Sequence, residues 1–329
     1  MVFRRRKAEG GGSGAPLRLY YASDIHGTEV LWLKFLNAPK HYKAQVLVMG
    51  GDVTGKMVIP LVEDPQGVFS GQMFGRSERA ESEDELAALE RRIRGNGMYP
   101  YRTTASEVAQ ISGLPEEERE RWFEGVMLQT FARWLEQADE RLAVSGVPCF
   151  VMPGNDDPTS LEEQLAAAKY VEACDERIVE FDGYTMLSLG YSNRTPWDSP
   201  RELDEDELFR RVEALASQVD DLSRCIFNLH VPPYDSGLDT AAELDADFHM
   251  VLIGKEPHMI PVGSTAVREA IERFQPIAAL HGHIHESAGA TRIGRTLCVN
   301  PGSDYHTGRI AGCLVNLDGA TARHQFVTG

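Results

Sequence analysis

The sequence predicts an α/β protein whose strands lead into a polar site, and three observations support this prediction. Short apolar runs of strand type alternate with amphipathic helical segments along the chain. Several of these runs end directly in Asp, Asn or His. The 329 residues, 42% hydrophobic and 25% charged, suffice for a sizeable core. Because the carboxyl ends of parallel strands meet at one edge of a sheet, we expect these polar residues to converge there.

The first ordered element is predicted at residues 17–22, a strand that leads into an Asp-Ile-His sequence. The basic and then Gly-rich residues 1–16 before it are predicted to be a flexible tail. A helix that includes Trp32 and Phe35 follows the strand. Residues 45–49 then form a compact apolar run, and this second buried strand ends in Gly-Gly-Asp. A strand, a helix and a strand in this order indicate an α/β layer.

The pattern changes after the second strand. Charged helical patterns dominate residues 56–114, which we predict to be a helical insertion within a single domain of residues 17–329. Ser82 and Glu85 have the spacing of a capping box that opens a helix. A long helix is predicted after Pro115, and its apolar positions recur at helical spacing, which indicates core packing against the sheet.

Strand patterns return after residue 146, and most of them also end in polar residues. The sequence contains no internal repeat and no long linker that would divide this core. A helix is predicted from Ser264 to Phe274. The predicted strands are residues 147–152, 185–189, 225–229, 277–280, 296–299 and, as the last one, 312–315.

Charge and composition exclude some classes of partner. The formal net charge of −17, from 33 basic and 50 acidic residues, disfavours double-stranded nucleic acid and anionic membranes. No apolar run has the length of a membrane span, and the N-terminus lacks the apolar segment of a secretory signal. The five cysteines are scattered without a C-x-x-C pair, which favours buried, reduced thiols in a cytoplasmic protein.

Seven side chains of metal-ligand type follow five separate apolar runs. They offer oxygen and nitrogen without thiolate, a set that suits Mn, Fe, Co, Ni or Zn. Seven donors exceed what one catalytic metal usually takes from a protein, and two ions that share a bridging carboxylate account for the number better. The seven residues are Asp24, His26, Asp52, Asn155, His230, His283 and His285.

The order of these motifs, D-x-H, G-D, G-N, H and G-H-x-H, resembles the calcineurin-like metallophosphoesterase superfamily. The match extends from about residue 17 to residue 318 and includes every metal-ligand position. The segments around Pro232-Pro233, Val262-Gly263-Ser264 and Asn300-Pro301-Gly302-Ser303 are similar to a group of small bacterial and archaeal metallophosphoesterases, most of them without an assigned substrate.

The resemblance implies both a fold and a metal centre. The fold is the calcineurin-like phosphoesterase fold of the α+β class, a four-layer β-sandwich flanked by helices, here with the helical insertion after the second core strand. The implied cofactors are two divalent metal ions, Mn²⁺ foremost, with Fe, Ni, Co or Zn as alternatives. Asp24, His26 and His285 would hold one ion, Asn155, His230 and His283 the other, and Asp52 would bridge them.

The implied activity is hydrolysis of a small phosphoester by hydroxide that the metal ions activate, with Asp52, Asn155 and His230 at the reacting centre. Two departures from the family pattern bear on the substrate. Asp156 occupies the position where many members carry a His that is thought to protonate the leaving group, and no second Asp follows Gly51-Asp52 closely. We therefore expect phosphodiesters or activated esters to be preferred over alkyl phosphomonoesters.

Two further site candidates have alternative interpretations. Asp156 either orients a ligand or caps the following turn, and His281 is either a proton donor near the metals or a hydrogen-bonded core histidine. The function also has alternatives. One is a nuclease that acts on small or single-stranded nucleic acid, and another is a metal-binding interaction scaffold. The oligomeric state is left open, with a homo-oligomer among the options.

Overall fold

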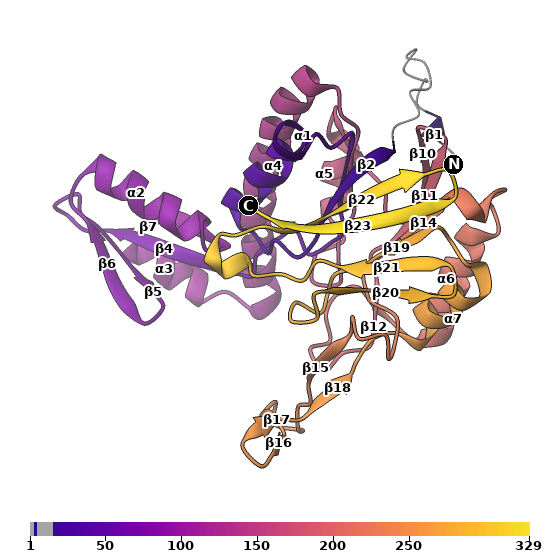
Figure 1. Ribbon diagram of the computed structural model, residues 1–329. Coiled ribbons are helices and arrows are strands. Elements are labelled where there is room, and N and C mark those ends of the chain that lie inside the picture. The colour runs from indigo at the N-terminus through magenta and orange to yellow at the C-terminus, as the bar shows by residue number, and fades with distance from the viewer. Residues whose placement is uncertain (1–2, 5–15) are drawn as a thin grey trace.

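In the computed structural model, which describes residues 3–4 and 16–329, two large sheets lie face to face with helices on both outer sides (Figure 1). One sheet has six strands and the other seven. The order of layers is helix, sheet, sheet, helix, and each interface is filled by its own cluster of buried apolar side chains. The predicted four-layer α+β fold is therefore confirmed.

The six-stranded sheet carries the first half of the predicted site. Its order is β23-β22-β2-β3-β8-β9. Strands β2, β3, β8 and β9 are parallel to one another, and β22 pairs antiparallel with both β2 and β23. The sequence pattern placed the last strand at 312–315, but a further strand follows it at the sheet edge, where its mostly exposed side chains give no apolar run. The strands are β2 (Leu17–Ala22), β3 (Val46–Met49), β8 (Cys149–Val151), β9 (Val171–Ala173), β22 (Ala311–Asp318) and β23 (Thr321–Thr328).

The seven-stranded sheet carries the second half of the site. Its order is β1-β10-β11-β14-β19-β21-β20, with β11, β14, β19 and β21 parallel. The strands are β1 (Phe3–Arg4), β10 (Arg177–Phe181), β11 (Tyr184–Leu189), β14 (Cys225–Leu229), β19 (Ala278–Leu280), β20 (Gly289–Ile293) and β21 (Thr296–Asn300). Two shorter strands, β12 (Ser192–Asn193) and β13 (Glu202–Leu203), pair outside this sheet.

One segment of the predicted flexible tail forms a strand. Phe3–Arg4 pairs in parallel with β10, because the edge of the sheet offers unpaired backbone groups there. Residues 1–2 and 5–15 of the predicted tail lie outside the described residues. Among the residues that the structure describes, no helix is long and apolar enough to cross a membrane.

Helices cover each sheet because strands buried on both faces need apolar cover on both. In β2, Leu19 and Tyr21 face the core between the sheets, whereas Tyr20 faces the helices. Trp32 and Trp134 stack between α1 and α4 with ring centroids 5.8 Å apart, which confirms the predicted core role of the long helix. The helices over the six-stranded sheet are α1 (Glu29–Tyr42), α4 (Glu116–Ser145) and α5 (Leu161–Ala167), and those over the other are α6 (Glu205–Ala216) and α7 (Thr265–Phe274). The 3-10 turns are Leu222–Arg224 and Tyr305–Thr307.

The insertion, residues 56–114, is not mainly helical as predicted but contains a four-stranded sheet of order β6-β5-β4-β7. Only α2 has the strongly charged amphipathic pattern that suggested helices, and it begins where predicted, with Ser82 as its N-cap. The sheet packs against α2 around a buried core of its own that includes Leu61 and Leu86. The elements are β4 (Met57–Glu63), β5 (Phe69–Met73), β6 (Arg76–Ala80), α2 (Glu83–Arg94), β7 (Met98–Thr104) and α3 (Ala105–Ser112).

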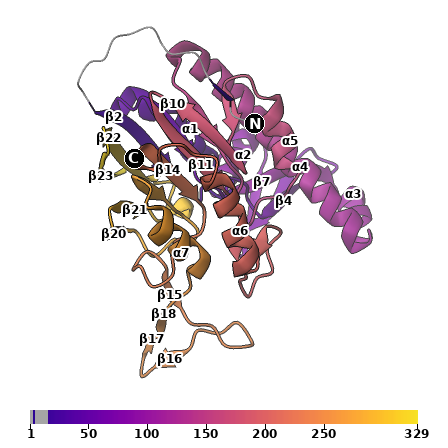
Figure 2. The same ribbon diagram turned by 90° about the vertical axis from the view of Figure 1, so that its right-hand side faces the viewer.

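A second projection, which we call the arm, comprises residues 240–261. Figures 1 and 2 show it extending away from the seven-stranded sheet as a narrow hairpin. The pair β15 (Thr240–Ala242) and β18 (Met259–Pro261) forms its base, and the pair β16 (Leu252–Ile253) and β17 (Glu256–Pro257) lies at its tip. The sequence predicts no element in this stretch.

Candidate metal centre

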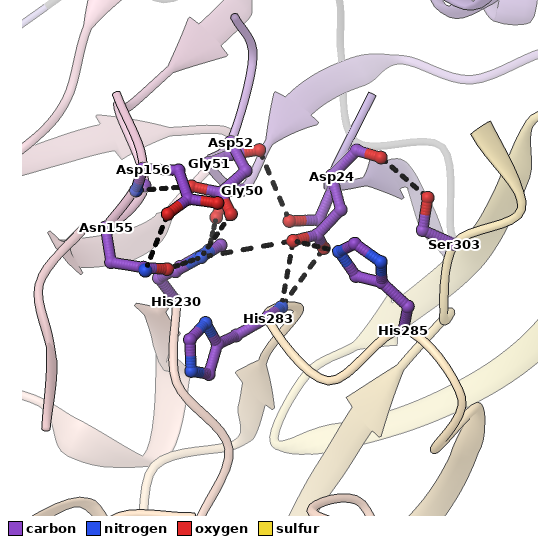
Figure 3. A network of polar contacts seen from close by, with 12 residues as sticks. Asp24, Gly50, Gly51, Asp52, Asn155, Asp156, His230, His283, His285 and Ser303 are labelled. Atoms are coloured by element: carbon purple, nitrogen blue, oxygen red, sulfur yellow. Dashed lines mark hydrogen bonds and ion pairs between the residues drawn. The ribbon is translucent and has the colours of Figure 1, made fainter. Parts of the chain in front are cut away.

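The predicted ligands come together at the carboxyl ends of strands from both sheets, and Figure 3 labels all of them except His26. Asp24 and His26 follow β2, Asp52 follows β3 and Asn155 follows β8, all in the six-stranded sheet. The three remaining predicted ligands, His230, His283 and His285, follow β14 and β19 of the seven-stranded sheet. The site therefore lies where the two sheets face each other, and neither sheet could build it alone.

Four of these residues have a left-handed backbone conformation. Their φ angles are 56° at Asp24, 38° at His26, 48° at Asp52 and 66° at His283. This conformation costs a residue with a Cβ roughly 1–2 kcal/mol. Hydrogen bonds between the loops after β2 and β3 stabilise this strained backbone. The Asp24 N–H donates to the Gly51 carbonyl over 3.0 Å, and the His26 N–H donates to the Asp52 carbonyl over 3.0 Å. Strained backbone concentrated in this way is typical of functional sites.

The glycines of the G-N and G-H-x-H motifs have a steric explanation. A Cβ on Gly154 would overlap the Asp52 carboxylate, and one on Gly282 would overlap the Asp24 carboxylate. The chain must therefore have glycine directly before Asn155 and His283 for the loops to approach the two aspartates.

The first group of donors consists of Asp24, His26 and His285, whose ligand atoms all lie within 4.8 Å of one another. The Nε2 atoms of His26 and His285 are 3.0 Å apart, and His285 Nε2 lies 3.5 Å from Asp24 Oδ1. The backbone N–H of His283 donates to Asp24 Oδ1 and Oδ2 over 3.0 and 3.1 Å, which fixes the orientation of that carboxylate (Figure 3).

The second group consists of Asp52, His230 and His283, again within 4.8 Å. His230 Nε2 lies 3.5 Å from Asp52 Oδ2 and 3.0 Å from the Asn155 side-chain oxygen. Asp52 Oδ2 is also 3.7 Å from His26 Nε2, in the first group. Asp52 is thus placed between the two groups.

The donor chemistry fits a cation. His230 Nδ1 lies 2.8 Å from the Gly50 carbonyl oxygen, so Nδ1 carries a proton and donates it there. Its other nitrogen, Nε2, then faces the Asp52 carboxylate and the Asn155 oxygen, both of them acceptors. Such a set of converging lone pairs is satisfied either by an added proton on His230 or by a metal ion at the centre of the group.

The electrostatics of the site lead to the same conclusion. Burial by itself would lower the pKa of His230, but Asp52 and Asp24 outweigh burial and raise the pKa to about 10. Burial would raise the pKa of Asp52, but His230 and His26 outweigh it and hold the pKa well below its usual range. The buried carboxylates therefore require compensating positive charge, which divalent ions supply.

Asp156 lies at the edge of the site and contacts both donor groups. Its backbone N–H donates to Asp52 Oδ1 over 3.0 Å, and its carboxylate lies within 4.8 Å of ligand atoms of His26 and Asp52. The same carboxylate accepts hydrogen bonds from Ser199 Oγ, at 2.7 Å, and from the Asn155 amide. Lys56 forms an ion pair with it.

His281 lies outside both donor groups. It is fully buried, and its Nδ1 is 2.8 Å from the Leu229 carbonyl and 3.1 Å from the Val231 carbonyl, on either side of His230. Burial lowers its pKa to about 4, so the imidazole is neutral near pH 7. The Nδ1 contacts are those of a hydrogen-bonded core histidine, whereas the buried Nε2 has no hydrogen-bond partner among the described residues.

Asp157, the residue after Asp156, connects two ligand loops. It is fully buried, and its carboxylate accepts backbone N–H groups of Val53, Thr54 and Gly154 over 2.8–2.9 Å. Burial, together with the nearby Asp52 charge, raises its pKa. The run of polar residues after β8 was the available signal, but only the fold places this carboxylate beneath the Asp52 loop.

The insertion also touches the ligand loops. The Gly55 N–H donates to the Tyr99 hydroxyl of β7 over 2.7 Å. A Cβ on Gly97 would overlap the His26 carbonyl oxygen. The turn before β7 therefore packs against the loops that carry His26 and Asp52, a contact that the sequence did not indicate.

Comparison with one solved structure supports the fold. No family model matches the chain. The uncharacterised protein MJ1162 of Methanocaldococcus jannaschii is 31% identical over 152 residues. The matched segment covers 46% of this chain and 62% of that protein, which is less than two thirds of its length. One solved crystal structure superimposes with a TM-score of 0.55 at 15% identity, covering 94% of this chain and 98% of that one. Another, TT1561 of Thermus thermophilus, has a TM-score of 0.48 at 13% identity, with the same coverage.

Proposed function

We propose that this protein is a metal-dependent phosphoester hydrolase that prefers phosphodiesters. The observation that carries the proposal is the pair of donor groups that meet at Asp52. Adjacent metal sites that share a carboxylate are the arrangement used to hydrolyse phosphate esters. The oxygen and nitrogen donors, without thiolate, suit Mn²⁺ foremost, and Fe, Co, Ni or Zn as alternatives.

In this proposal Asp24, His26 and His285 hold one ion, while His230, His283 and Asn155 hold the other, with Asp52 bridging. Divalent ions at these positions would supply Lewis acidity and lower the pKa of a bound water towards neutrality. Hydrolysis adds water across the P–O bond, so that its oxygen joins phosphorus and a proton goes to the leaving oxygen. Asn155 is a suitable ligand because it adds no negative charge beside an anionic substrate.

The edge of the site supports the preference for diesters. Asp156 is paired with Lys56, and a carboxylate held in this way does not donate a proton to a leaving alkoxide. The Lys56 ammonium stabilises negative charge that develops on the leaving oxygen, a role that suffices for good leaving groups. A phosphodiester also carries one negative charge fewer than a monoester dianion, which suits a site with Asp24, Asp52 and Asp156.

The test combines metal binding with matched substrates. Protein stripped with a chelator is titrated with Mn²⁺ by calorimetry, and hydrolysis of methyl p-nitrophenyl phosphate is compared with that of p-nitrophenyl phosphate, which has the same leaving group. We expect two bound equivalents and faster hydrolysis of the diester. Faster hydrolysis of the monoester would refute the diester preference, and no metal-dependent turnover of either ester would refute the hydrolase. A labelled single-stranded oligonucleotide tests the nuclease alternative in the same assay.

A further inference from the structure

Among the described residues, exposed large apolar side chains are concentrated on the arm. Phe248 is 51% exposed and stacks on Trp197, which is 63% exposed and belongs to the loop after β12. The ring centroids lie 5.1 Å apart with an interplanar angle of 28°. The exposed apolar residues of the arm are Phe248, Met250, Leu252, Ile253 and Met259.

The Trp197 loop is tied directly to the candidate metal centre. Ser199, two residues after Trp197, donates its hydroxyl to Asp156 Oδ1 over 2.7 Å. The Glu202 carboxylate fixes the same loop, because it accepts the backbone N–H groups of Thr195 and Ser199 over 2.9 and 3.1 Å. The indole is therefore carried by a loop whose position is set from within the site.

The base of the arm is fixed to the loops that carry the histidine ligands. Ser287, two residues after His285, donates its hydroxyl to the Thr240 carbonyl over 2.7 Å and accepts the Thr240 N–H over 2.8 Å. Asp239, in the segment that follows His230, accepts the Gly263 N–H over 3.0 Å, just past the other end of the arm. The stacked pair is thus joined to the metal centre from both sides.

We propose that Trp197 and Phe248 form a stacking platform for a planar aromatic group of the substrate, such as a nucleobase, on the ester group that stays on phosphorus when the leaving group departs. This inference rests on the proposed function. Phe248 stacks against the indole of Trp197, and the exposed part of the indole is open to a further ring, which would extend the stack. The neighbouring Met250, 59% exposed, provides an adaptable apolar contact of the kind found at such sites.

The charges around the platform favour a small substrate over a polymer. Asp247 directly precedes Phe248, Asp245 lies three residues before it, and both are exposed. Carboxylates at this position repel the phosphate backbone of a long nucleic acid, whereas a single aromatic group stacks without bringing further charge near them. The platform therefore adds selectivity for the organic group of a small diester.

Two diesters with the same leaving group test the platform. Thymidine 5′-(p-nitrophenyl phosphate) carries a nucleobase, and methyl p-nitrophenyl phosphate does not. Stacking predicts a KM for the nucleoside ester that is roughly tenfold lower in the wild type. Trp197→Ala and Phe248→Ala should raise the KM of the nucleoside ester roughly tenfold and so remove this advantage. Phe326→Ala, which removes a 40% exposed ring on β23, is the matched control and should keep the advantage.

The outcomes separate the platform from the hydrolase. Equal KM values for the two esters in the wild type, or an equal loss on both in Trp197→Ala, would overturn the platform and leave the hydrolase intact. A wild-type dimer that Trp197→Ala dissociates, seen by light scattering, would also overturn it, because a second copy would then cover these rings. If neither ester is cleaved, the hydrolase fails. Calorimetric binding of thymidine 5′-monophosphate that Trp197→Ala abolishes would still support the platform, and its absence in the wild type would overturn it.

Discussion

The insertion and the arm both project from the sandwich beside the candidate metal centre. The insertion buries its apolar side chains, whereas the arm leaves them exposed to solvent. The insertion buries Leu61, Leu86 and Ile93 in a core between its sheet and α2. The arm is a hairpin without a covering layer, and it leaves Leu252 and Ile253 55% and 65% exposed. A packed projection can transmit support to a neighbouring loop, whereas an open one offers a surface for a ligand.

The insertion and the arm also differ in which part of the site they contact. The insertion places the Tyr99 hydroxyl on the Gly55 N–H and the Gly97 turn against the His26 carbonyl, both of them contacts to ligand loops. The arm is attached through Ser287 and presents Phe248 to Trp197 in solvent. The insertion therefore contacts the loops that carry the predicted metal ligands, whereas the arm carries one ring of the proposed stacking platform.

The largest effect should come from the centre that both projections adjoin. Asp52→Asn removes the charge shared by the two donor groups, and several kcal/mol of transition-state stabilisation by metal ions corresponds to a loss of roughly a thousandfold in kcat/KM. The measurement is diester hydrolysis under saturating Mn²⁺, with circular dichroism to verify folding. Asp318→Asn, on an exposed carboxylate at the end of β22, is the control. A rate that Asp52→Asn leaves unchanged would reject the site.

The next comparison tests whether the two projections differ in stability as their packing indicates. Leu61→Ala in the core of the insertion should lower the free energy of unfolding by about 2–5 kcal/mol. Ile253→Ala on the arm should change it by less than about 0.5 kcal/mol. Denaturant unfolding measures both. Similar losses for the two variants would show that the arm is also packed, and the contrast between the projections would be lost.

A smaller effect should reveal whether the insertion supports the ligand loops. Gly97→Ala brings a Cβ against the His26 carbonyl at a φ of 74°, and displacing a group behind the ligands weakens metal binding by roughly 10- to 100-fold. Gly75→Ala has nearly the same φ, 73°, with nothing within 4 Å, so it isolates backbone strain from the contact. Mn²⁺ titration by calorimetry compares them. Equal affinities in the two variants would argue against a supporting role.

The smallest effect concerns Lys56, at the root of the insertion. Lys56→Gln removes the cation paired with Asp156, and because the lysine side chain is 65% exposed we expect a loss of only about fivefold in kcat, larger for poor leaving groups than for p-nitrophenolate. A series of aryl diesters measures this dependence. Lys40→Gln on α1 is the control. A uniform loss across the series would assign Lys56 to binding, away from the leaving oxygen.

The parts of the fold that the sequence predicted are those in which burial leaves a strong pattern. The runs at 17–22 and 225–229 correspond to whole strands, because strands covered on both faces are continuously apolar. The strands of the insertion escaped prediction because β4 alternates and α2 dominates the pattern with its charges. The arm left no signal because its apolar residues stay in solvent.

For the candidate site, the sequence by itself determined which residue types follow the strand ends, and therefore the donor chemistry. The resemblance already implied that His283 and His285 belong to different donor groups with Asp52 between them, but only the tertiary structure brings these side chains together. It also decided that Asp157 braces the loops and that Tyr99 reaches Gly55. The physical reason is that a ligand's chemistry belongs to its own side chain, whereas grouping depends on strand order, which makes neighbours of loops far apart in the chain.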